Sequence, residues 1–432
     1  MKRYDSYKDS GVKWLGEIPS HWKMERWRFL MNENVSKNNN CNVRLQLQFK
    51  YGDIVRKSNQ SEEKDVLETI SKYTVVEPDD IMINGLNLNY DFISQRVARV
   101  REEGAITSAY VSLRPTEIAD SRFYTYFLKS MDAKKMFHGM GTGIRLTLSY
   151  NELKNQFLPK PSIKEQEAIA NYLDSATSKI DEAIAQQQKM IDLLNERKQI
   201  IINNAVTKGL DPNVKMKPSG IDWIGDIPEH WEIRKLGSIG STINGVSHDS
   251  SYFGEGFPFV SYSDVYKNNF LPKIVTGLAK SSKLERKIFS VERGDVFFTR
   301  TSETAEEIGF TSTCLDTISN AVFAGFLIRF RPKKGLIEPS FSKYYFRAHI
   351  HRSYFVKEMN LVIRASLSQQ LLKGLPILLP PLKEQKKIAD YLDNKVAGID
   401  SCISNINQQI SLLQERKQIT INDVVTGKVK VV

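Results

Sequence analysis

Two stretches of the chain carry apolar residues at alternating steps of four and three positions. No proline or glycine interrupts residues 163–207 in the first of them. A spacing of 3.5 residues kept over several heptads predicts a coiled-coil seam, and a helix of about 40 residues would be roughly 60 Å long. Because each helix alone would expose its seam, we predict two long antiparallel helices that pair with each other. The alternative is that each helix pairs with another protein, and both can be true on different faces. The seam positions are Ile169, Leu173, Ala176, Ile180, Ala183, Gln187, Met190 and Leu194 in the first stretch, and Ile388, Leu392, Lys395, Ile399, Cys402, Ile406, Gln409 and Leu413 in the second.

The two stretches are copies of each other, and a second phrase is also duplicated. "KEQEAIANYLD" begins at Lys164 and "KEQKKIADYLD" at Lys383, which is 219 residues later. "GVKWLGEIPSHW" begins at Gly11 and "GIDWIGDIPEHW" at Gly220, which is 209 residues later. Duplication on this scale predicts a chain built as two similar halves. We expect a first domain at residues 1–161, a spacer helix at 162–210, a second domain at 211–381 and a second spacer helix at 382–432.

Such a repeat has consequences for the arrangement of the chain. Two copies of one unit predict a pseudo-twofold molecule with two domains joined by the antiparallel helices. The C-terminal "VVTGKVKVV" is then expected to end near the start of the first domain, which makes the chain nearly circular. The five tryptophans all lie in or beside the short repeats, and we expect them to pack where each domain meets the helices, because Trp buries a large apolar area.

The regions inside the repeats differ from each other. Residues 25–161 and 232–381 mix strand-like runs, such as "AYVSLRP" and "FLIRFRP", with short amphipathic helical stretches. This mixture predicts α+β domains. An acidic turn followed by a strand recurs in both, as "VEPDDIMING" from Val76 and "VERGDVFFTR" from Val291. Different contents in the same frame favour one scaffold that reads two different targets.

Composition narrows the class of protein. The 61 basic and 50 acidic residues give a net charge of +11, which suits a polyanion partner but does not prove one. Three distant cysteines and the lack of an apolar N-terminal or membrane-length segment predict a soluble cytoplasmic protein. We find no phosphate-binding loop and no other catalytic motif, and the pair His349 and His351 lacks further metal ligands nearby in sequence. The chain is therefore expected to bind rather than to catalyse.

The duplicated phrases resemble a known family. "SGVKWLGEIPSHW", "SGIDWIGDIPEHW" and "PPLKEQKKIADYLD" are similar to the specificity subunit of type I restriction–modification systems, over essentially the whole chain and in the family's order of target-recognition domain, helix, target-recognition domain, helix. The resemblance implies a non-catalytic reader of double-stranded DNA. Each domain would recognise one half of an asymmetric bipartite site, and the helix pair would set the gap.

The resemblance also implies partners. Two modification subunits would dock on the helices, and restriction subunits would join them in a complete system. No cofactor is implied for this chain, whereas S-adenosylmethionine, ATP and Mg²⁺ would belong to the partner subunits. The assembled complex would be an adenine-specific DNA methyltransferase and an ATP-dependent endonuclease.

Candidate contact residues follow from side-chain chemistry, because Arg suits guanine and Asn or Gln suits adenine. The polar loop after each acidic turn supplies candidates for base contacts, while two arginines at equivalent places before the helices suit phosphates. The identical "ERKQI" blocks suit two identical partners. The DNA candidates are Asn84, Asn87, Asn89, Gln95, Arg96, Arg300, Thr301 and Ser302, with Arg145 and Arg364 for phosphates, and the partner candidates are Glu196, Arg197, Lys198, Glu415, Arg416 and Lys417.

Two alternatives remain open at this point. The chain could be a coiled-coil adaptor with two protein-binding heads, or a DNA-binding regulator without partner subunits. Each candidate loop could be an ordinary solvated loop, each of the two arginines could form a structural salt bridge, and the identity of the "ERKQI" blocks also fits simple duplication.

Overall fold

The computed structural model describes residues 2–58, 64–93, 95–144, 146–301, 308–359 and 367–431, without the side chains of 64–67 and 356–359. Its contacts divide the chain into two compact units. The first comprises Met1–Gln187 and Asn407–Val432, and the second comprises Gln188–Ile406. Each unit therefore contains one globular domain and one half of each long helix.

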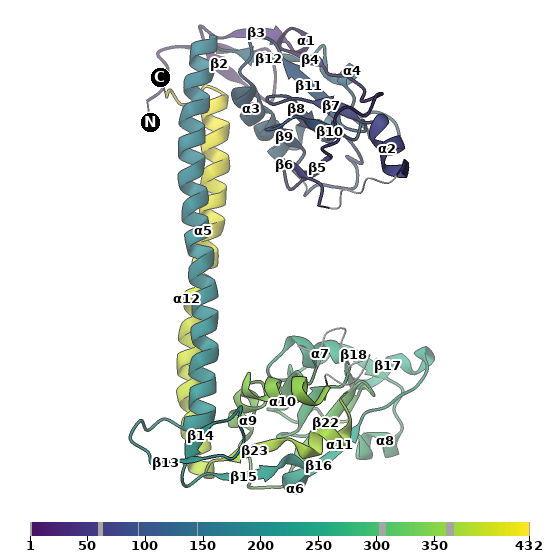
Figure 1. The fold of residues 1–432 in the computed structure, drawn as a ribbon, viewed down its shortest axis with the longest axis vertical. Helices are drawn as coiled ribbons and strands as arrows, with labels where there is room; N and C mark the ends of the chain where they lie inside the picture. The colour runs from purple at the N-terminus through teal and green to yellow at the C-terminus, as the bar shows by residue number, and fades with distance from the viewer. Residues whose placement is uncertain are drawn as a thin grey trace. The chain divides into compact units, whose positions relative to one another are not determined.

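The two long helices predicted from the repeats are α5, Ile163–Lys208, and α12, Leu382–Val425 (Figure 1). In the first unit, Lys417 Nζ donates a hydrogen bond to Asp181 Oδ1 at 2.7 Å, and Gln187 Nε2 donates one to Gln409 Oε1 at 3.1 Å. Residue numbers rise along α5 while those of the partners in α12 fall, so the two helices are antiparallel in this unit. In the second unit Lys198 pairs with Asp400 at 2.8 Å.

At four predicted seam positions, Met190, Lys395, Cys402 and Gln409, the next residue along the chain is the more buried one. The predicted Met190 is 50% exposed, while its neighbour Ile191 is 7% exposed. In the second helix Cys402 is exposed and Ile403 is half-buried. Val396 and Ile410 are likewise half-buried beside the exposed Lys395 and Gln409, whereas Ala183 and its neighbour Ile184 are both half-buried. Where the predicted residue is Cys, Lys or Gln, the aliphatic neighbour occupies the seam because it removes more apolar area from water. Eight further apolar residues of the predicted seam are buried or half-buried, namely Ile169, Leu173, Ile180, Leu194, Ile388, Leu392, Ile399 and Leu413.

The first domain is built on an antiparallel four-stranded sheet in the order β4-β11-β8-β9. The helix α3, Ser121–Ala133, follows the sheet, and its buried aromatic face joins the domain core. The strands of the sheet are β4 Met31–Glu33, β11 Val111–Pro115, β8 Ile81–Ile83 and β9 Val97–Arg99, and the flanking pairs are β1 Tyr7–Asp9 with β2 Glu17–Pro19 and β3 Lys23–Arg26 with β12 Phe157–Lys160.

The second domain repeats this plan. Its antiparallel sheet has the order β16-β22-β19-β20, and α9, Pro339–Tyr345, takes the place of α3. The strands are β16 Gly240–Asn244, β22 Leu327–Pro332, β19 Val296–Thr299 and β20 Thr311–Thr313, and the flanking pairs are β13 Met216–Pro218 with β14 Asp226–Pro228 and β15 Glu232–Lys235 with β23 Pro376–Leu379. The repeat seen in the sequence is thus a repeat of strand order.

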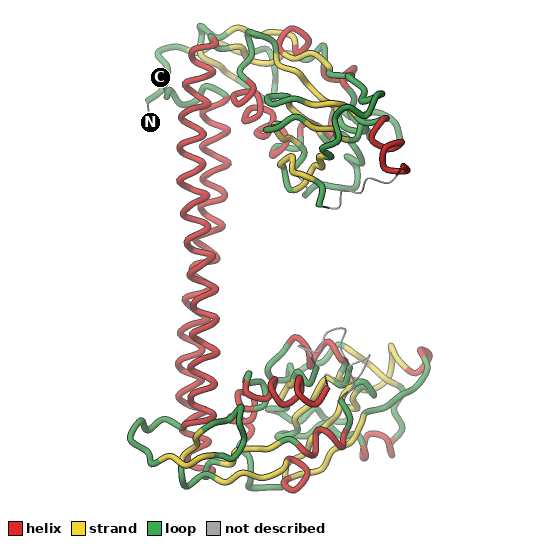
Figure 2. The backbone as a smooth tube through the Cα atoms, viewed as in Figure 1, coloured by secondary structure: helices red, strands yellow, loops and turns green. Residues whose placement is uncertain are grey.

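The domains differ in what is added to the sheet (Figure 2). The first adds β5 Leu47–Lys50, β6 Asp53–Arg56, β7 Thr74–Val76, β10 Gly104–Ile106, α1 Trp27–Leu30, α2 Lys64–Ser71, η1 Met136–Gly139 and α4 Tyr150–Leu153. The second adds β17 Phe253–Val260, β18 Gly277–Ala279, β21 Val322–Phe323, α6 Leu236–Ile239, η2 Ser250–Tyr252, α7 Tyr262–Lys267, α8 Lys283–Ile288, α10 Ile350–Met359 and α11 Gln369–Gly374. The α+β prediction is confirmed, and the shared frame carries unlike additions.

A glutamine at the start of each long helix ties that helix to its domain. Gln166 of α5 donates to the carbonyls of Ile118 and Pro161 and accepts the backbone N–H of Asp120 at 2.8 Å, next to the start of α3. Gln385 of α12 makes the same three bonds, to Leu336, Pro380 and Glu338. Because each glutamine ties a long helix to the first turn of a domain helix, the residue recurs in both copies.

The tryptophan phrases anchor the domains on the helices. Trp22, Trp27 and Trp231 are fully buried, which confirms their predicted role in the core. Glu165 accepts bonds from Trp22 Nε1 at 3.0 Å and from His21 Nε2 at 3.0 Å. In the second unit His230 Nε2 binds Glu384 at 2.8 Å.

The C-terminal segment returns to the first domain, as predicted. The backbone N–H of Lys430 donates to the carbonyl of Lys2 at 2.9 Å. Gly427 lies so close to Pro19 and Trp22 that a β-carbon there would come within 2.4 Å of the proline ring. None of the helices in the described ranges has the length and apolar content needed to cross a membrane.

Candidate nucleic-acid interface

The acidic turn before each central strand is held by a buried carboxylate. Asp80 accepts both Nε and Nη2 of Arg114 at 2.9 Å, together with the backbone N–H of Glu77 at 3.0 Å. Asp295 accepts the same groups of Arg331 at 2.6 Å and the N–H of Glu292 at 2.8 Å. Bidentate Arg–carboxylate pairs are directional as well as strong. These pairs hold the turns that precede β8 and β19, and each of these strands leads into a loop with candidate contact residues.

The loop after β8 is organised from beneath by Arg96. Its guanidinium is fully buried and donates to the carbonyls of Asn84 at 3.0 Å, Leu86 at 2.8 Å and Asp91 at 2.7 Å. The guanidinium that we expect from the sequence to contact bases is instead enclosed by carbonyls of this loop. Loop carbonyls without strand partners need donors once they are buried, and this arginine supplies them.

The same loop turns an unusual set of side chains to solvent. Asn87, in a left-handed conformation with φ 53°, and Gln95 are exposed, as predicted for contact residues. Tyr90 is 77% exposed and Ile93 94% exposed, and Phe92 stacks on His138 with ring centroids 4.7 Å apart. Exposed apolar side chains gathered on one loop mark an interaction surface. Composition alone does not identify them, although a cluster of aromatic and aliphatic residues in an otherwise polar loop is a signal.

The other two candidates in this loop are only partly exposed. Asn84 uses its side-chain oxygen to accept the backbone N–H of Leu86 at 3.2 Å, and Asn89 donates to the carbonyl of Ile144 at 3.4 Å. Both amides therefore shape the loop from within, which leaves Asn87 and Gln95 as the exposed candidates.

The corresponding loop of the second domain leaves β19 at Arg300. The backbone of this half-buried residue donates to Phe326 at 2.9 Å and accepts from Leu367 at 2.8 Å, and Thr301 is exposed. Ser302, Arg145 and Arg364 lie outside the described residues.

Two arginines that the sequence did not single out bind the backbone of residues 308–311, which lead into β20. Arg347 donates to the carbonyls of Thr311 at 2.8 Å and Tyr266 at 3.1 Å. Arg352 donates to Ile308 and Gly309. Both guanidinium groups lie near the ring of Phe310, 4.5 and 5.3 Å from its centroid. Burial lowers the pKa of Arg347, and burial together with the charge of Arg347 lowers the pKa of Arg352 to about 10.

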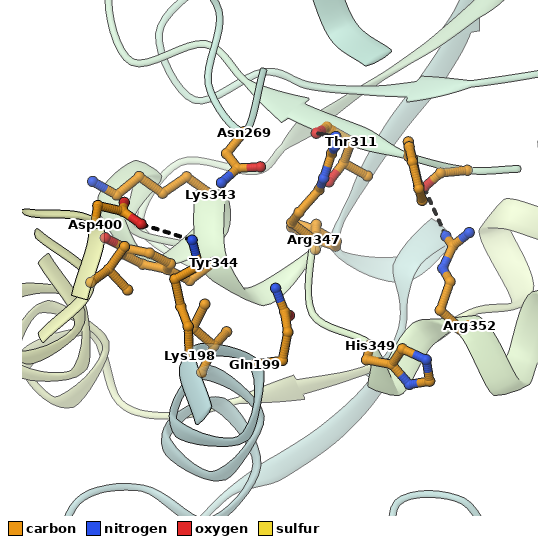
Figure 3. A pocket seen from close by; sticks show the side chains of 15 residues that line it. Lys198, Gln199, Asn269, Thr311, Lys343, Tyr344, Arg347, His349, Arg352 and Asp400 are labelled. Carbon is orange, nitrogen blue, oxygen red and sulfur yellow. Dashed lines mark hydrogen bonds and ion pairs between the residues drawn. The ribbon is translucent and has the colours of Figure 1, made fainter. Parts of the chain in front are cut away.

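These arginines line a pocket of about 410 Å³ beside the long helices (Figure 3). Lys198 of α5 and Lys343 of α9 also line it, together with the exposed His349. His351 is buried instead, so the two histidines do not face one solvent-accessible site. Among the described residues no group of three or more metal-binding side chains is found.

The partner candidates on the helices fall into two groups. Glu196, Arg197, Glu415 and Arg416 are exposed. Lys198 and Lys417 instead bridge the helices through Asp400 and Asp181, so these two lysines stabilise the helix pair. The "ERK" blocks therefore offer two exposed side chains each.

Comparison with known proteins places this architecture. A family model described as the type I restriction modification DNA specificity domain matches residues 35–191 and 228–412. The type I restriction enzyme MjaVIII specificity subunit of Methanocaldococcus jannaschii is 25% identical over 369 residues, which cover 84% of this chain and 81% of that protein. The fold matches the HsdS subunit from Thermoanaerobacter tengcongensis with a TM-score of 0.52 at 17% identity, over 95% of this chain and 98% of that one. A chain from a study of assembly and conformational transition of the type I R-M system matches with a TM-score of 0.71 at 15% identity, over 95% of this chain and 99% of that one. The chain therefore belongs to the type I restriction–modification DNA specificity family.

Proposed function

We propose that this protein is the DNA-reading subunit of a type I restriction–modification complex, in which each domain recognises one half of an asymmetric bipartite site. One observation carries the proposal. The same strand order, the same glutamine clamp and the same Asp–Arg pair occur twice, while the additions to the two sheets differ. A frame that is kept twice with unlike loops suits two unlike half-sites read in one register.

The chemistry of the loops supports this division of labour. The exposed Asn87 and Gln95 in the first domain present amides that suit adenine edges, and Thr301 presents a hydroxyl in the second. Tyr90, Phe92 and Ile93 add apolar contact area, of the kind that meets a thymine methyl group. The residues outside the described ranges, Ser302, Arg145 and Arg364, stay candidates by their chemistry.

The helix pair serves as spacer and docking surface. Helices that are tied to both domains set the gap between half-sites, and one inserted base pair moves the second half-site by roughly 3.4 Å and a tenth of a turn. The exposed Glu196, Arg197, Glu415 and Arg416 are the docking candidates for two methyltransferase subunits. Those subunits would supply S-adenosylmethionine-dependent adenine methylation, and restriction subunits would supply ATP- and Mg²⁺-dependent cleavage, in the cytoplasm.

The experiment that tests the proposal is the adenine methylome of the host with and without this gene. Loss of a single gapped, asymmetric motif is expected, and it gives both half-sites and the gap. Exchanging residues 25–161 for those of another such domain is expected to change one half only. An unchanged methylome in the deletion strain contradicts the role as a methylation specificity subunit, and joint loss of both halves in the exchange contradicts the modular reading.

A further inference from the structure

The pocket in Figure 3 joins the second domain to the helices. Lys198 comes from α5, Asp400 from α12 and Lys343 from α9, while Arg347 lies two residues after the end of α9. All these residues belong to the second unit. A volume of about 410 Å³ is several times the roughly 30 Å³ that one water molecule occupies in the liquid. The pocket therefore has room for a phosphate group with its hydration water.

The pocket carries more positive charge than its carboxylates balance. Lys198 pairs with Asp400 at 2.8 Å and Lys343 with Asp393 at 2.6 Å. The polar contacts of Arg347 are to backbone carbonyls, and within the described ranges it forms no ion pair. A partly buried cation without a carboxylate is costly, and burial accordingly lowers its pKa. An anion from another molecule would remove that cost.

An equivalent position in the first unit has the same character. Arg347 lies nine residues after Glu338, and Lys129 nine residues after Asp120, the two residues whose N–H groups bind the repeated glutamines. Lys129 lines a smaller pocket of about 110 Å³ with three arginines, Arg99, Arg101 and Arg122, and two carboxylates, Asp53 and Asp174. Arg101 pairs with Asp53 at 3.6 Å. No hydrogen bond or ion pair of the Lys129 ammonium group is found among the described residues, and burial lowers its pKa.

The long helix beside each pocket also presents the same residue. Lys198 lines the pocket of the second unit, and its counterpart in the repeat is Lys417. Burial, with a smaller contribution from the charge of Lys417, lowers the pKa of Lys129, and Lys417 itself pairs with Asp181 at 2.7 Å. A lysine of the helix pair and a basic residue in or just after the domain helix therefore recur at equivalent positions in both units.

We propose that each of these two pockets binds one phosphate of the DNA backbone, through Lys198, Lys343 and Arg347 in the second unit and through Lys129 and Arg101 in the first. Base contacts must differ between unlike half-sites, whereas backbone contacts carry no sequence information and need not differ. Cations repeated at equivalent places among unlike loops fit the second kind of contact. Residues of the domain and of a long helix line each pocket. A phosphate bound there would therefore hold the DNA at a fixed position relative to the helix pair. This assignment rests on the proposed DNA-reading function.

The test measures duplex affinity of the full-length protein at graded salt. The variant Lys198→Gln/Lys343→Gln leaves the arginines and their carbonyl bonds in place, so the loop return is retained. We expect its plot of log affinity against log salt to be shallower by about one, the value for one lost phosphate contact on duplex DNA. Affinity for specific and non-specific duplexes is expected to fall by the same factor.

A matched control removes the same charge elsewhere in the same unit. Lys215 is an exposed lysine that pairs with Glu229 at 3.1 Å, and Lys334 is exposed, so Lys215→Gln/Lys334→Gln changes net charge equally. This control is expected to keep the wild-type slope. Thermal unfolding of both variants checks that the fold is retained.

The outcomes separate the two proposals. If the wild-type protein binds no duplex, the proposed function fails and this inference fails with it. If the wild-type protein binds and the pocket variant keeps its slope, only the inference is overturned. A loss confined to the specific duplex would identify base contacts and also overturn it. Calorimetry with inorganic phosphate tests the remaining source, because phosphate binding that the variant loses without any change in DNA slope identifies a free-anion site instead.

Discussion

Removing the Glu165 carboxylate should destabilise the first unit strongly. Its oxygens accept Tyr4 Oη at 2.8 Å, Trp22 Nε1 at 3.0 Å and His21 Nε2 at 3.0 Å. Trp22 is fully buried and Tyr4 nearly so. In Glu165→Ala both donors lose their acceptor, and a buried donor without a partner costs about 1–3 kcal/mol. The expected loss in free energy of unfolding is therefore about 4 kcal/mol.

The repeat supplies an internal control. Glu384 occupies the same place in the second unit but bonds only His230, at 2.8 Å, among the contacts described for it, and both side chains reach solvent. Trp231 Nε1, the counterpart of the donor in Trp22, has no partner in the described part of the chain even before mutation. Glu384→Ala therefore removes an exposed pair, and the expected loss is about 1 kcal/mol or less.

Hydrogen exchange followed by mass spectrometry is the suitable assay, because peptides from each domain report on their own unit. Glu165→Ala should accelerate exchange in the core peptides of the first domain, and Glu384→Ala should leave the second domain close to wild type. Equal losses in the two units would refute the reasoning, since it attributes the difference to buried donors and not to the repeated sequence position.

Three further predictions concern the loop, the pH dependence and the smaller pocket. Arg96→Leu removes the donors of three loop carbonyls, so exchange in residues 84–93 should accelerate and one half of the methylated motif should be lost while the other is kept. Burial lowers the pKa of His351 to about 3 from 6.5. Above pH 6.5 this side chain is neutral in both the folded and the unfolded state, so it does not reduce stability there. As the pH falls from there toward 3, the unfolded state binds the proton first and stability decreases, by about 2 kcal/mol between pH 7 and 5. Denaturant titrations at the two pH values should show that His351→Phe lacks this loss, and an unchanged loss would assign it to other groups. Lys129→Gln should make the salt dependence of duplex binding shallower by about one while the methylated motif stays the same, and a changed motif would contradict a backbone contact.

The helix pair and the duplicated frame were predictable because they are written in local sequence. Heptad spacing, and in the first helix the absence of proline and glycine, depend on neighbours a few residues apart, and the repeats mark their own boundaries. The seam register was not predictable where two apolar residues are adjacent, as at Met190 and Ile191. Either residue satisfies the spacing, and only the facing helix determines which one is buried.

The candidate interface was harder to predict for a related reason. Arginine chemistry suggests a surface contact, yet Arg96 is enclosed by carbonyls of the loop that it follows. Its burial depends on how that loop folds back over the sheet, which no pattern along the chain specifies. The pocket of the second unit likewise unites Lys198 with Lys343 and Arg347, which are far apart in sequence. These residues come together only when α9 packs beside α5 in the folded chain.

The division between frame and loops has a consequence for how such a protein can change its target. The residues that secure the frame, such as Gln166, Gln385, Asp80 and Asp295, satisfy buried partners within the frame itself. Side chains such as Asn87, Tyr90 and Gln95 project into solvent, and surface substitutions away from buried networks usually change stability by less than about 0.5 kcal/mol. Substitutions in the loops can therefore alter the half-site with little loss of stability. Substitutions in the frame lower stability whichever half-site the domain reads, and this asymmetry explains why the duplicated phrases and the unlike loops coexist in one chain.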